Sequence, residues 1–458
     1  MAFNAAVVLE VRLTGSDTNG GGFQTGASGT DWSLQDAAQY SVTDGVTAGT
    51  TTITSATANF GTDVVGNIMY VQGGTGSVVA GWYQITSRTN NTTIVVDRST
   101  GLTAGTGVTL KIGGALQSPG MAGGVLVSGG SVAGNKVFIK YNASPYVITT
   151  NGTNVSGGCA VPPSDVYWSG YDTTRALYTI QANRPTLQLN SGVSSANVMG
   201  GTNNTYYLQS LILDANSQTS SRGAFQTGEF FYVKAMNATT AGIFNNGDSG
   251  KAFLCEATGC TATPIRVAFC HSCVAYNNTL TSPTNAGAFQ QNGLYSSVNC
   301  IAYGNNCIGF TTFLNINCTS YGNSLAGFDA INQTTICANC IAENNATTGY
   351  RTNVGRITLI NCASYNNTSG RYGSGGGTLN GDVNPITGSG SFFTNAASQD
   401  FSLNNTAGAG ASARAVGFPA SFPVGTNLNY HDVGALQHQD SGGGGSTGIS
   451  RARGASGF

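Results

Sequence analysis

A short motif that recurs five times constrains the fold of this chain more than any other feature of its sequence. Each copy contains a cysteine and, five positions later, an asparagine, and the cysteines follow one another at intervals of 27, 18, 22 and 22 residues. A unit of this length cannot bury its own apolar side, and such repeats are typical of solenoids, in which successive copies stack. The cysteines are Cys273, Cys300, Cys318, Cys340 and Cys362, and the asparagines are Asn278, Asn305, Asn323, Asn345 and Asn367.

Each copy has the pattern of a short strand, a tight turn and a second strand. The cysteine and the residue two positions later share one face of a strand, and the Gly and Asn residues that follow tolerate the positive φ of a turn. Coils stacked about 4.8 Å apart place equivalent residues over one another, so we predict columns of thiols, aromatic rings and hydrogen-bonded amides. The predicted fold class is all-β, a right-handed parallel β-helix. The aromatic column comprises Phe310, Phe328, Tyr350 and Tyr372.

The period breaks towards both ends of the chain. Between residues 43 and 113, short runs of β-branched and aromatic residues alternate with Gly, Asn and Thr, which predicts a small antiparallel β module. The glycine-rich C-terminus ends in Arg451, Arg453 and Phe458, which we interpret as a docking tail. The predicted organisation is an N-terminal capping segment at 1–42, the β module at 43–113, the β-helix at 114–380, a closing segment at 381–440 and the tail at 441–458.

The low charge of the chain excludes several classes of partner. Charged residues make up 8% of the sequence, with 18 Lys and Arg against 19 Asp and Glu. A nucleic-acid surface needs clustered cations, so we expect no nucleic-acid partner. No run approaches the ~20 apolar residues of a membrane span, and the N-terminus lacks the basic and apolar regions of a secretory signal. The 11 cysteines cannot all pair. We therefore expect free thiols in a reducing cytoplasm. We also expect no cofactor and no metal.

Segments near both ends of the chain carry a family resemblance. The segments Val11–Asn19 and Trp32–Ala38 resemble the opening of pectate-lyase-like parallel β-helix proteins, and Gln399–Leu403 with Asp432–Gln437 is similar to their closing segment. The longer opening, Glu10–Phe23, with the β module behind it, resembles β-helix structural proteins of tailed bacteriophages. That resemblance implies a virion protein that folds in the host cytoplasm and works outside the cell after lysis. It also implies other virion proteins as partners and a homotrimer as the assembly.

The same family resemblance raises the question of catalysis. Pectate lyases of this fold gather Asp and Glu side chains to hold Ca²⁺ and use Arg or Lys as a base, and the related hydrolases use closely spaced carboxylates. In the repeat region of this chain the carboxylates are separate, so only the stacking of coils would bring two together. The alternative interpretation is solvated carboxylates in turns. The weak catalytic candidates are Asp214, Glu256, Asp329 and Glu343.

Two Cys-x-x-Cys pairs, Cys270 with Cys273 and Cys337 with Cys340, resemble zinc ligands. On a strand, residues i and i+3 point to opposite faces, which is poor chelate geometry, so no metal is expected here.

Two further features admit more than one interpretation. His431 and Asp432 lie in the closing segment without a serine in a nucleophile-elbow context, so we predict a surface or capping role rather than catalysis. Four tyrosines in equivalent turns form a predicted surface stripe, which either binds sugar rings or stacks on itself. These tyrosines are Tyr276, Tyr303, Tyr321 and Tyr365.

Taken together, the sequence favours a non-enzymatic virion component, namely a β-helical spike, fibre or capsid-decorating protein, with host-surface polysaccharide as a further candidate partner. The first alternative is a polysaccharide lyase or glycoside hydrolase that acts as a depolymerase on the same fold. The second alternative is a bacterial surface adhesin.

Overall fold

The computed structural model divides into two compact units, Met1–Gly250 and Lys251–Phe458, called here the first and the second unit. Each unit is described by itself. The structure describes residues 3–129, 132–149, 166–200, 206–225, 228–244, 250–290, 295–414, 416–417 and 432–436. The docking tail with Arg451, Arg453 and Phe458, as well as His431, therefore lies outside the described residues.

A closed antiparallel barrel forms the N-terminal part of the first unit, which confirms the predicted β module. Its strands pair in the order β3-β4-β7-β6-β5-β8. The barrel encloses buried apolar side chains, among them Ile53, Val71 and Leu110. The short helices η1 (Trp32–Leu34) and η2 (Thr62–Val64) lie before and within the barrel segment. The strands are β3 (Tyr40–Thr47), β4 (Thr52–Thr54), β5 (Ile68–Gly73), β6 (Gly81–Asn90), β7 (Thr93–Val96) and β8 (Gly105–Ile112).

Helix α1 (Pro119–Gly129) occupies a stretch that the sequence assigned to the β-helix, and this part of the prediction is wrong. The Ser118 hydroxyl accepts a hydrogen bond from the Met121 amide at 3.2 Å, and proline stands at the first helical position, so the start is capped. Val125 and Leu126 are fully buried. An apolar run bounded by a cap and a proline favours a helix over the short strands of a coil.

The first unit continues with parallel coils built from three sheets. Strand β1 (Val7–Val11) pairs antiparallel with β2 (Gly22–Gln24) and parallel with β9, which ties the N-terminus to the coils. One sheet continues from β1 with β9 (Lys136–Lys140), β11 (Val166–Tyr171), β14 (Tyr206–Gln209) and β17 (Gly228–Phe231). Another contains β10 (Tyr146–Ile148), β12 (Thr186–Leu189), β15 (Ile212–Asp214) and β18 (Lys234–Met236). The remaining sheet contains β13 (Asn197–Gly200), β16 (Arg222–Phe225) and β19 (Ala241–Phe244).

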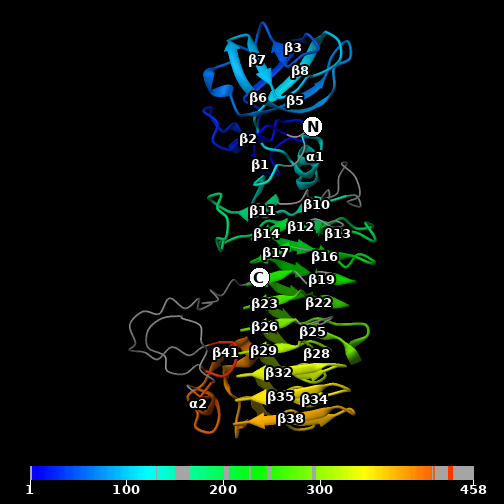
Figure 1. Cartoon of the computed structure of the whole chain (residues 1–458), viewed down its shortest axis with the longest axis vertical. Coiled ribbons are helices and arrows are strands. Elements are labelled where there is room, and N and C mark those ends of the chain that lie inside the picture. Colours follow the sequence, from blue (N-terminus) through cyan, green and yellow to red (C-terminus); the bar gives the residue numbers. More distant parts are fainter. Residues whose placement is uncertain are drawn as a thin grey trace. The chain divides into compact units, whose positions relative to one another are not determined.

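The second unit contains the motif repeats and also consists of parallel coils with three sheets, called here the first, second and third sheet. Figure 1 shows the labelled strands of the first sheet stacked one above another. The first sheet contains β20 (Lys251–Phe253), β23 (Phe269–His271), β26 (Ser296–Val298), β29 (Leu314–Ile316), β32 (Thr334–Ala338), β35 (Arg356–Ile360) and β38 (Thr378–Val383).

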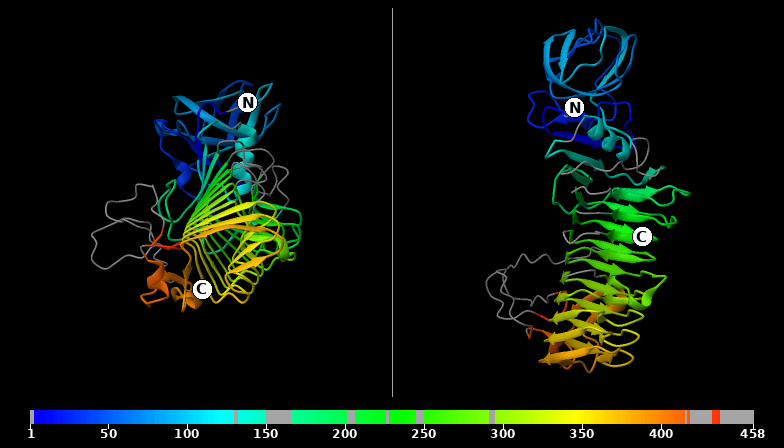
Figure 2. Two further views of the ribbon diagram at one scale, coloured as in Figure 1. Left: turned by 60° about the horizontal axis from the view of Figure 1, so that its bottom comes forward. Right: turned by 45° about the vertical axis from the view of Figure 1, so that its right-hand side comes forward.

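The other two sheets run alongside it (Figure 2), and each coil up to β37 contributes one strand to each sheet in turn. The parallel pairing confirms the predicted β-helix, and β38 and β39 extend it past residue 380. The second sheet contains β21 (Glu256–Thr258), β24 (Val274–Tyr276), β27 (Ile301–Tyr303), β30 (Thr319–Tyr321), β33 (Ile341–Glu343), β36 (Ala363–Tyr365) and β39 (Ile386–Thr387). The third contains β22 (Thr263–Arg266), β25 (Gly287–Phe289), β28 (Ile308–Phe310), β31 (Phe328–Ala330), β34 (Tyr350–Thr352) and β37 (Tyr372–Ser374).

The motif asparagines of the second unit lie over one another inside the coils. The Nδ2 amide of Asn278 donates to Oδ1 of Asn305 at 2.8 Å, and that of Asn305 donates to Oδ1 of Asn323 at 2.8 Å. The ladder continues to Asn345 at 3.1 Å and to Asn367 at 2.9 Å. All five residues are buried. Each side-chain amide therefore hydrogen-bonds to the next one at the turns, where the backbone is not paired with a neighbouring strand.

The motif aromatics form a second internal column. The ring centroids of Phe310 and Phe328 are 4.9 Å apart and those of Phe328 and Tyr350 are 5.2 Å apart, with nearly parallel planes. Phe289 extends the column at 4.7 Å from Phe310, although its different spacing hid it in the sequence. Tyr372 pairs in register with Tyr350 but is 37% exposed.

The C-terminal segment covers the outer face of the second sheet. Its strands β40 (Phe393–Asn395) and β41 (Asp400–Leu403), with the short helices η4 (Ala396–Ser398) and α2 (Gly410–Ala413), lie beside the coils in Figure 1. Phe392, Phe393 and Phe401 join one apolar cluster with the outer residues of the sheet. The predicted surface stripe of tyrosines lies in this cluster, and Tyr303 is only 7% exposed. The stripe is therefore a covered face.

Candidate functional site

The third sheet carries an ion pair at the level of β31 and β34. Asp329 pairs in register with Arg351, whose Nε and Nη2 atoms lie 2.8 and 2.5 Å from Oδ2 of the carboxylate. The Asp329 side chain is fully buried, while that of Arg351 is 23% exposed. Burial raises the pKa of Asp329 above its ordinary value, and Arg351 opposes this effect without cancelling it.

A loop of residues 279–286 lies against this ion pair and accounts for the longest interval between motif cysteines. The Nη2 atom of Arg351 donates to the carbonyl oxygen of Thr284 at 3.4 Å, and Nδ2 of Asn353 donates to Oδ1 of Asn285 at 3.2 Å. The short helix η3 (Pro283–Asn285) forms the tip of the loop. The loop thus crosses from its own coil to the coil that carries β34.

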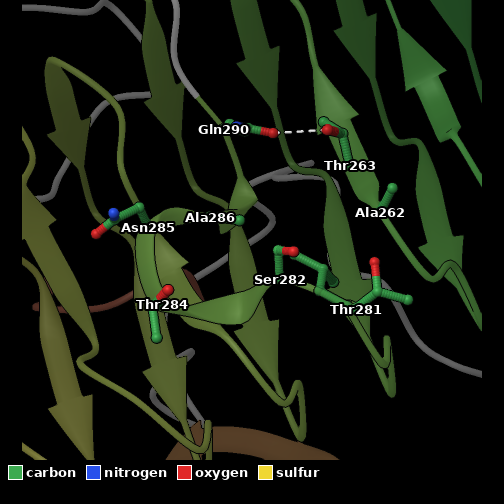
Figure 3. A pocket seen from close by; sticks show the side chains of 9 residues that line it. Ala262, Thr263, Thr281, Ser282, Thr284, Asn285, Ala286 and Gln290 are labelled. Atoms are coloured by element: carbon green, nitrogen blue, oxygen red, sulfur yellow. Dashed lines mark hydrogen bonds between the residues drawn. The ribbon is translucent and has the colours of Figure 1, made fainter.

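An open hollow of about 370 Å³ lies between this loop and the third sheet. Figure 3 shows Thr263 and Gln290 on the sheet side, joined by a hydrogen bond of 2.6 Å. None of the lining side chains is charged, and most end in a hydroxyl or an amide, which suits the hydroxyl groups of a neutral ligand. The lining residues are Ala262, Thr263, Leu280, Thr281, Ser282, Thr284, Asn285, Ala286 and Gln290.

The hollow and the ion pair share one row of residues on the third sheet. In register, the residues that follow Ile265 and the stacked rings come to lie next to one another, on the face opposite to the rings. The row is polar at Gln290 and Thr311 and charged at Arg266, Asp329 and Arg351. Its members are Arg266, Gln290, Thr311, Asp329 and Arg351.

The four candidate carboxylates do not form one site. Asp214 lies in the first unit, where its side chain accepts from the Gln188 and Asn237 amides at 2.7 and 2.9 Å. In the second unit, Asp329 belongs to the third sheet, whereas Glu256 and Glu343 belong to the second. Asp214, Asp329 and Glu343 are buried, so their interpretation as solvated turn carboxylates is wrong. Coil stacking gave each of them a neutral or cationic neighbour.

Glu343 lies beneath the C-terminal segment. Its Oε2 atom accepts from the backbone N–H of Phe392 at 2.9 Å. Glu343 replaces a tyrosine in the column of residues that contains Tyr321 and Tyr365. Burial raises the pKa of Glu343, while the hydrogen bonds to Ser391 and Phe392 lower it by less. The carboxyl therefore fixes the point where the C-terminal segment reaches the sheet.

We expect this carboxyl to make stability depend on pH. Because the folded-state pKa of Glu343 is raised, its contribution is fully present below its ordinary pKa of 4.5 and is lost as pH rises through the folded value. The free energy of unfolding of the wild type should therefore fall relative to that of Glu343→Gln as the pH rises above about 4.5. Urea unfolding at several pH values measures this difference. A difference that stays constant or changes in the opposite direction would contradict the assignment.

The Cys-x-x-Cys pairs both point into the core, so the expectation of opposite faces is wrong. Ser272 and Asn339 adopt positive φ values of 54° and 55° between the two cysteines of each pair, and this turn reverses the alternation. The Sγ atom of Cys318 lies 3.3 Å from the carbonyl oxygen of Ser297, to which it donates. Burial raises the pKa of the Cys318 thiol. Across the described ranges, no group of three or more His, Cys, Asp or Glu is placed to hold a metal.

A buried charged cluster in the first unit escaped the sequence analysis. Glu10 is fully buried and its carboxylate binds Nε of Arg12 at 2.8 Å and Nε of Arg175 at 2.7 Å. Arg175 also pairs with Asp31 at 2.9 Å, and the Tyr171 hydroxyl donates to Glu10. Burial, then the Glu10 charge, raises the pKa of Tyr171. The partners are up to 165 residues apart in the chain, so no local pattern announces them.

Two comparisons with known proteins find nothing: no protein-family model matches, and no curated protein matches. Among solved structures, the A-module of mannuronan C-5 epimerase AlgE6 from Azotobacter vinelandii is similar with a TM-score of 0.41 and 13% identity, over 59% of this chain and 82% of that chain. Pectate lyase Pel9A gives 0.35 and 12%, over 71% and 92%. The tailspike gp49 of Pseudomonas phage LKA1 gives 0.16 and 12%, over 76% and 62%.

Similarity at this level carries no argument about function. The predicted fold, a parallel β-helix like that of pectate lyases, rests on the strand pairing of the chain itself. None of the helices that the structure describes is long and apolar enough to cross a membrane.

Proposed function

We propose that this chain is a structural component of a tailed-bacteriophage particle, a β-helical spike, fibre or capsid-decorating protein. The observation that carries the proposal is the use that the fold makes of its buried carboxylates. Asp214 joins neighbouring coils through amide donors, Asp329 joins β31 to β34 through Arg351, and Glu343 holds the C-terminal segment. Carboxylates committed in this way stabilise the packing of coils within each unit. The opening segment Glu10–Phe23, which resembles that of phage β-helix proteins, supports the same function.

The interior supports a mechanical role. Asparagine amides and stacked rings repeat from coil to coil, so the core of the second unit contains similar contacts at a period of about 4.8 Å. Such contacts bind each coil chiefly to its neighbours. A spike or fibre needs this property, since load applied at one end is carried along the coils.

The proposed setting is the virion, reached after folding in the host cytoplasm, with other virion proteins as partners and a trimer as the assembly. Mass spectrometry of purified particles from a host that produces this protein should find it at a constant ratio to the major capsid protein. Its absence from intact particles, combined with its presence in the lysate, would refute the proposal.

The hollow beside Gln290 is the proposed contact for host-surface polysaccharide. Its hydroxyl and amide lining favours neutral sugars. Gln290→Ala removes the side chain that bonds Thr263 across the sheet side of the hollow, and we expect at least about tenfold weaker retention on immobilised capsule or lipopolysaccharide glycans. Thr378→Ala, at an exposed position on β38, is the matched control and should bind as the wild type does. Equal binding by both variants would exclude the hollow.

A polysaccharide-cleaving enzyme is the second candidate, and one observation favours it. Asp329 combines a raised pKa with a neighbouring guanidinium, and a carboxyl whose pKa is raised is better suited than an ordinary one to act as a general acid. Incubation with acidic polysaccharides, followed by assays for unsaturated and for reducing ends, tests this candidate. Products formed by the wild type and not by Asp329→Asn would replace the structural proposal with an enzymatic one.

A further inference from the structure

The coils of the second unit end in a last turn made of β37, β38 and β39, called here the terminal coil. Among the described strands these three are the last in their sheets, so one edge of each has no neighbouring strand there. Figure 1 shows β38 at that end of the unit. The edge of a sheet exposes unpaired N–H and C=O groups, which pair readily with a strand of another chain. A stack of coils therefore needs a last coil that differs from the others.

The terminal coil departs from the repeat at the residue that precedes the stacked ring. In the three coils before it this residue is glycine, namely Gly309, Gly327 and Gly349. A Cβ atom on Gly309 or on Gly327 would lie 2.6 Å from the carbonyl oxygen of the glycine one coil further on. In the terminal coil the same position is Arg371. A coil stacked beyond it would therefore meet a side chain where the earlier glycines leave room for the backbone.

The guanidinium of Arg371 closes the end of the core. Its Cζ atom lies 5.5 Å from the centroid of the buried Tyr350 ring, within the range of a cation–π contact. Nη1 donates to the carbonyl oxygen of Ile386 on β39 at 3.1 Å, and Nη2 donates to that of Cys362 at 3.0 Å. The side chain is only 14% exposed. Arg371 thus covers the last buried ring and binds backbone groups of the second sheet.

Asp382 on β38 places a carboxylate beside this guanidinium. Its two oxygens accept from Nε and Nη2 of Arg371, each at 3.0 Å. In register, Asp382 follows Cys337 and Leu359, which are both fully buried. A charged residue therefore occupies a position that belongs to the core in the two coils before it. A further coil would remove both charges from water, and this desolvation costs free energy. Arg371 and Asp382 are called here the plug.

The edge of β38 is also irregular. Its register with β35 shifts between Leu379 and Gly381, which leaves Asn380 as an extra residue. Bulges and inward-pointing charges both protect edge strands from pairing with other chains. The terminal coil combines a bulge, an inward ion pair and an arginine in a column of glycines. All three departures from the repeat oppose the addition of another strand.

We infer that the plug ends the stack of coils and keeps the edges of the terminal coil from pairing with a second copy of this chain. The inference goes beyond the proposed function and does not depend on it, because it concerns the chain alone. Restoring the repeat should remove the device. Arg371→Gly returns the glycine of the earlier coils, and Asp382→Leu returns the apolar residue found at 359. The open edges of the double variant should then pair with those of another copy.

Light scattering after gel filtration of the full chain measures this association. Between about 1 and about 100 μM the mass of the double variant should rise nearly twofold, as a dimer with a Kd near about 10 μM would. The mass of the wild type should not rise in this way. The matched control is Arg356→Gly with Asp400→Leu, which removes the same two charges at exposed positions outside the plug and should behave as the wild type does. Circular dichroism shows whether each variant is folded.

A cross-link locates the contact. Ser374→Cys adds a thiol at an exposed position on β37, and a short bis-maleimide should link two copies through it only when the plug has been removed. Cys159→Ser is included throughout, because Cys159 lies outside the described residues and the ten described cysteines are buried. Linking of copies with an intact plug would overturn the inference, and this test needs no change to Arg371 or Asp382.

The inference would also fail if a folded double variant neither gained mass nor formed the link. If that variant does not fold, Arg371→Ala with Asp382→Ala makes a smaller change and is judged by the same two measurements. Absence of the chain from phage particles would refute the virion proposal and would leave this inference intact.

Discussion

Replacing Asn323 by alanine is expected to destabilise the second unit by about 3–5 kcal/mol, because this amide is the middle rung of the asparagine ladder. Its Nδ2 atom donates to Oδ1 of Asn345 at 3.1 Å, to the Ser320 hydroxyl at 2.9 Å and to the Ala302 carbonyl at 3.0 Å. Its Oδ1 atom accepts from the backbone and side-chain N–H groups of Asn305. Alanine leaves these buried partners unsatisfied, at about 1–3 kcal/mol for each group.

Urea unfolding followed by circular dichroism measures this effect as a shift of the midpoint. Ser324→Ala changes the neighbouring position, which is exposed, and should cost less than about 0.5 kcal/mol. If Asn323→Ala were no more harmful than this control, water would be replacing the amide, and the ladder would not be the contact that holds the turns together.

The repeat predicted this ladder because its members recur at one offset from the cysteine. Because the coils stack, residues at the same offset from the cysteine in successive copies contact one another in space. In most other folds a shared sequence position does not predict such a contact. The rule also explains the glycine that precedes several of the stacked rings. A Cβ atom on Gly327 would lie 2.6 Å from the carbonyl oxygen of Gly349 and 2.9 Å from Nδ2 of Asn345, so no larger residue fits there.

Features that depend on contacts outside the repeat were not predictable in this way. The sequence indicates neither that Phe392 and Phe393 fold back onto the second sheet nor that Glu343 lies under them, because the segments are about 50 residues apart. The same holds for Glu10 and Arg175. Asp329 was recognised as a candidate, but its partner Arg351 is one coil away, and the interval between motif cysteines varies. The repeat predicts the columns of stacked side chains, but it does not predict which segments pack on the outer side of the sheets.

The aromatic column provides the other prediction with a large expected effect. Phe328 is fully buried between the rings of Phe310 and Tyr350, at centroid distances of 4.9 and 5.2 Å. Phe328→Ala removes a ring that two neighbours contact on both faces, and coils held at a fixed spacing by backbone hydrogen bonds cannot close the gap. We therefore expect a loss of about 3–5 kcal/mol, the range for large-to-small changes in rigid cores.

Two further variants separate volume from position. Phe328→Leu keeps most of the apolar volume and loses the stacked geometry, so it should cost about 1–2 kcal/mol. Tyr372→Ala lies in the same register at the end of the column, where the ring is 37% exposed, and should cost about 1 kcal/mol or less. Unfolding in urea ranks the three. If Phe328→Ala cost as little as Tyr372→Ala, the coils would be able to collapse onto the vacated space. The rigidity that the proposed structural role requires in the second unit would then have to come from the backbone ladders and the asparagines alone.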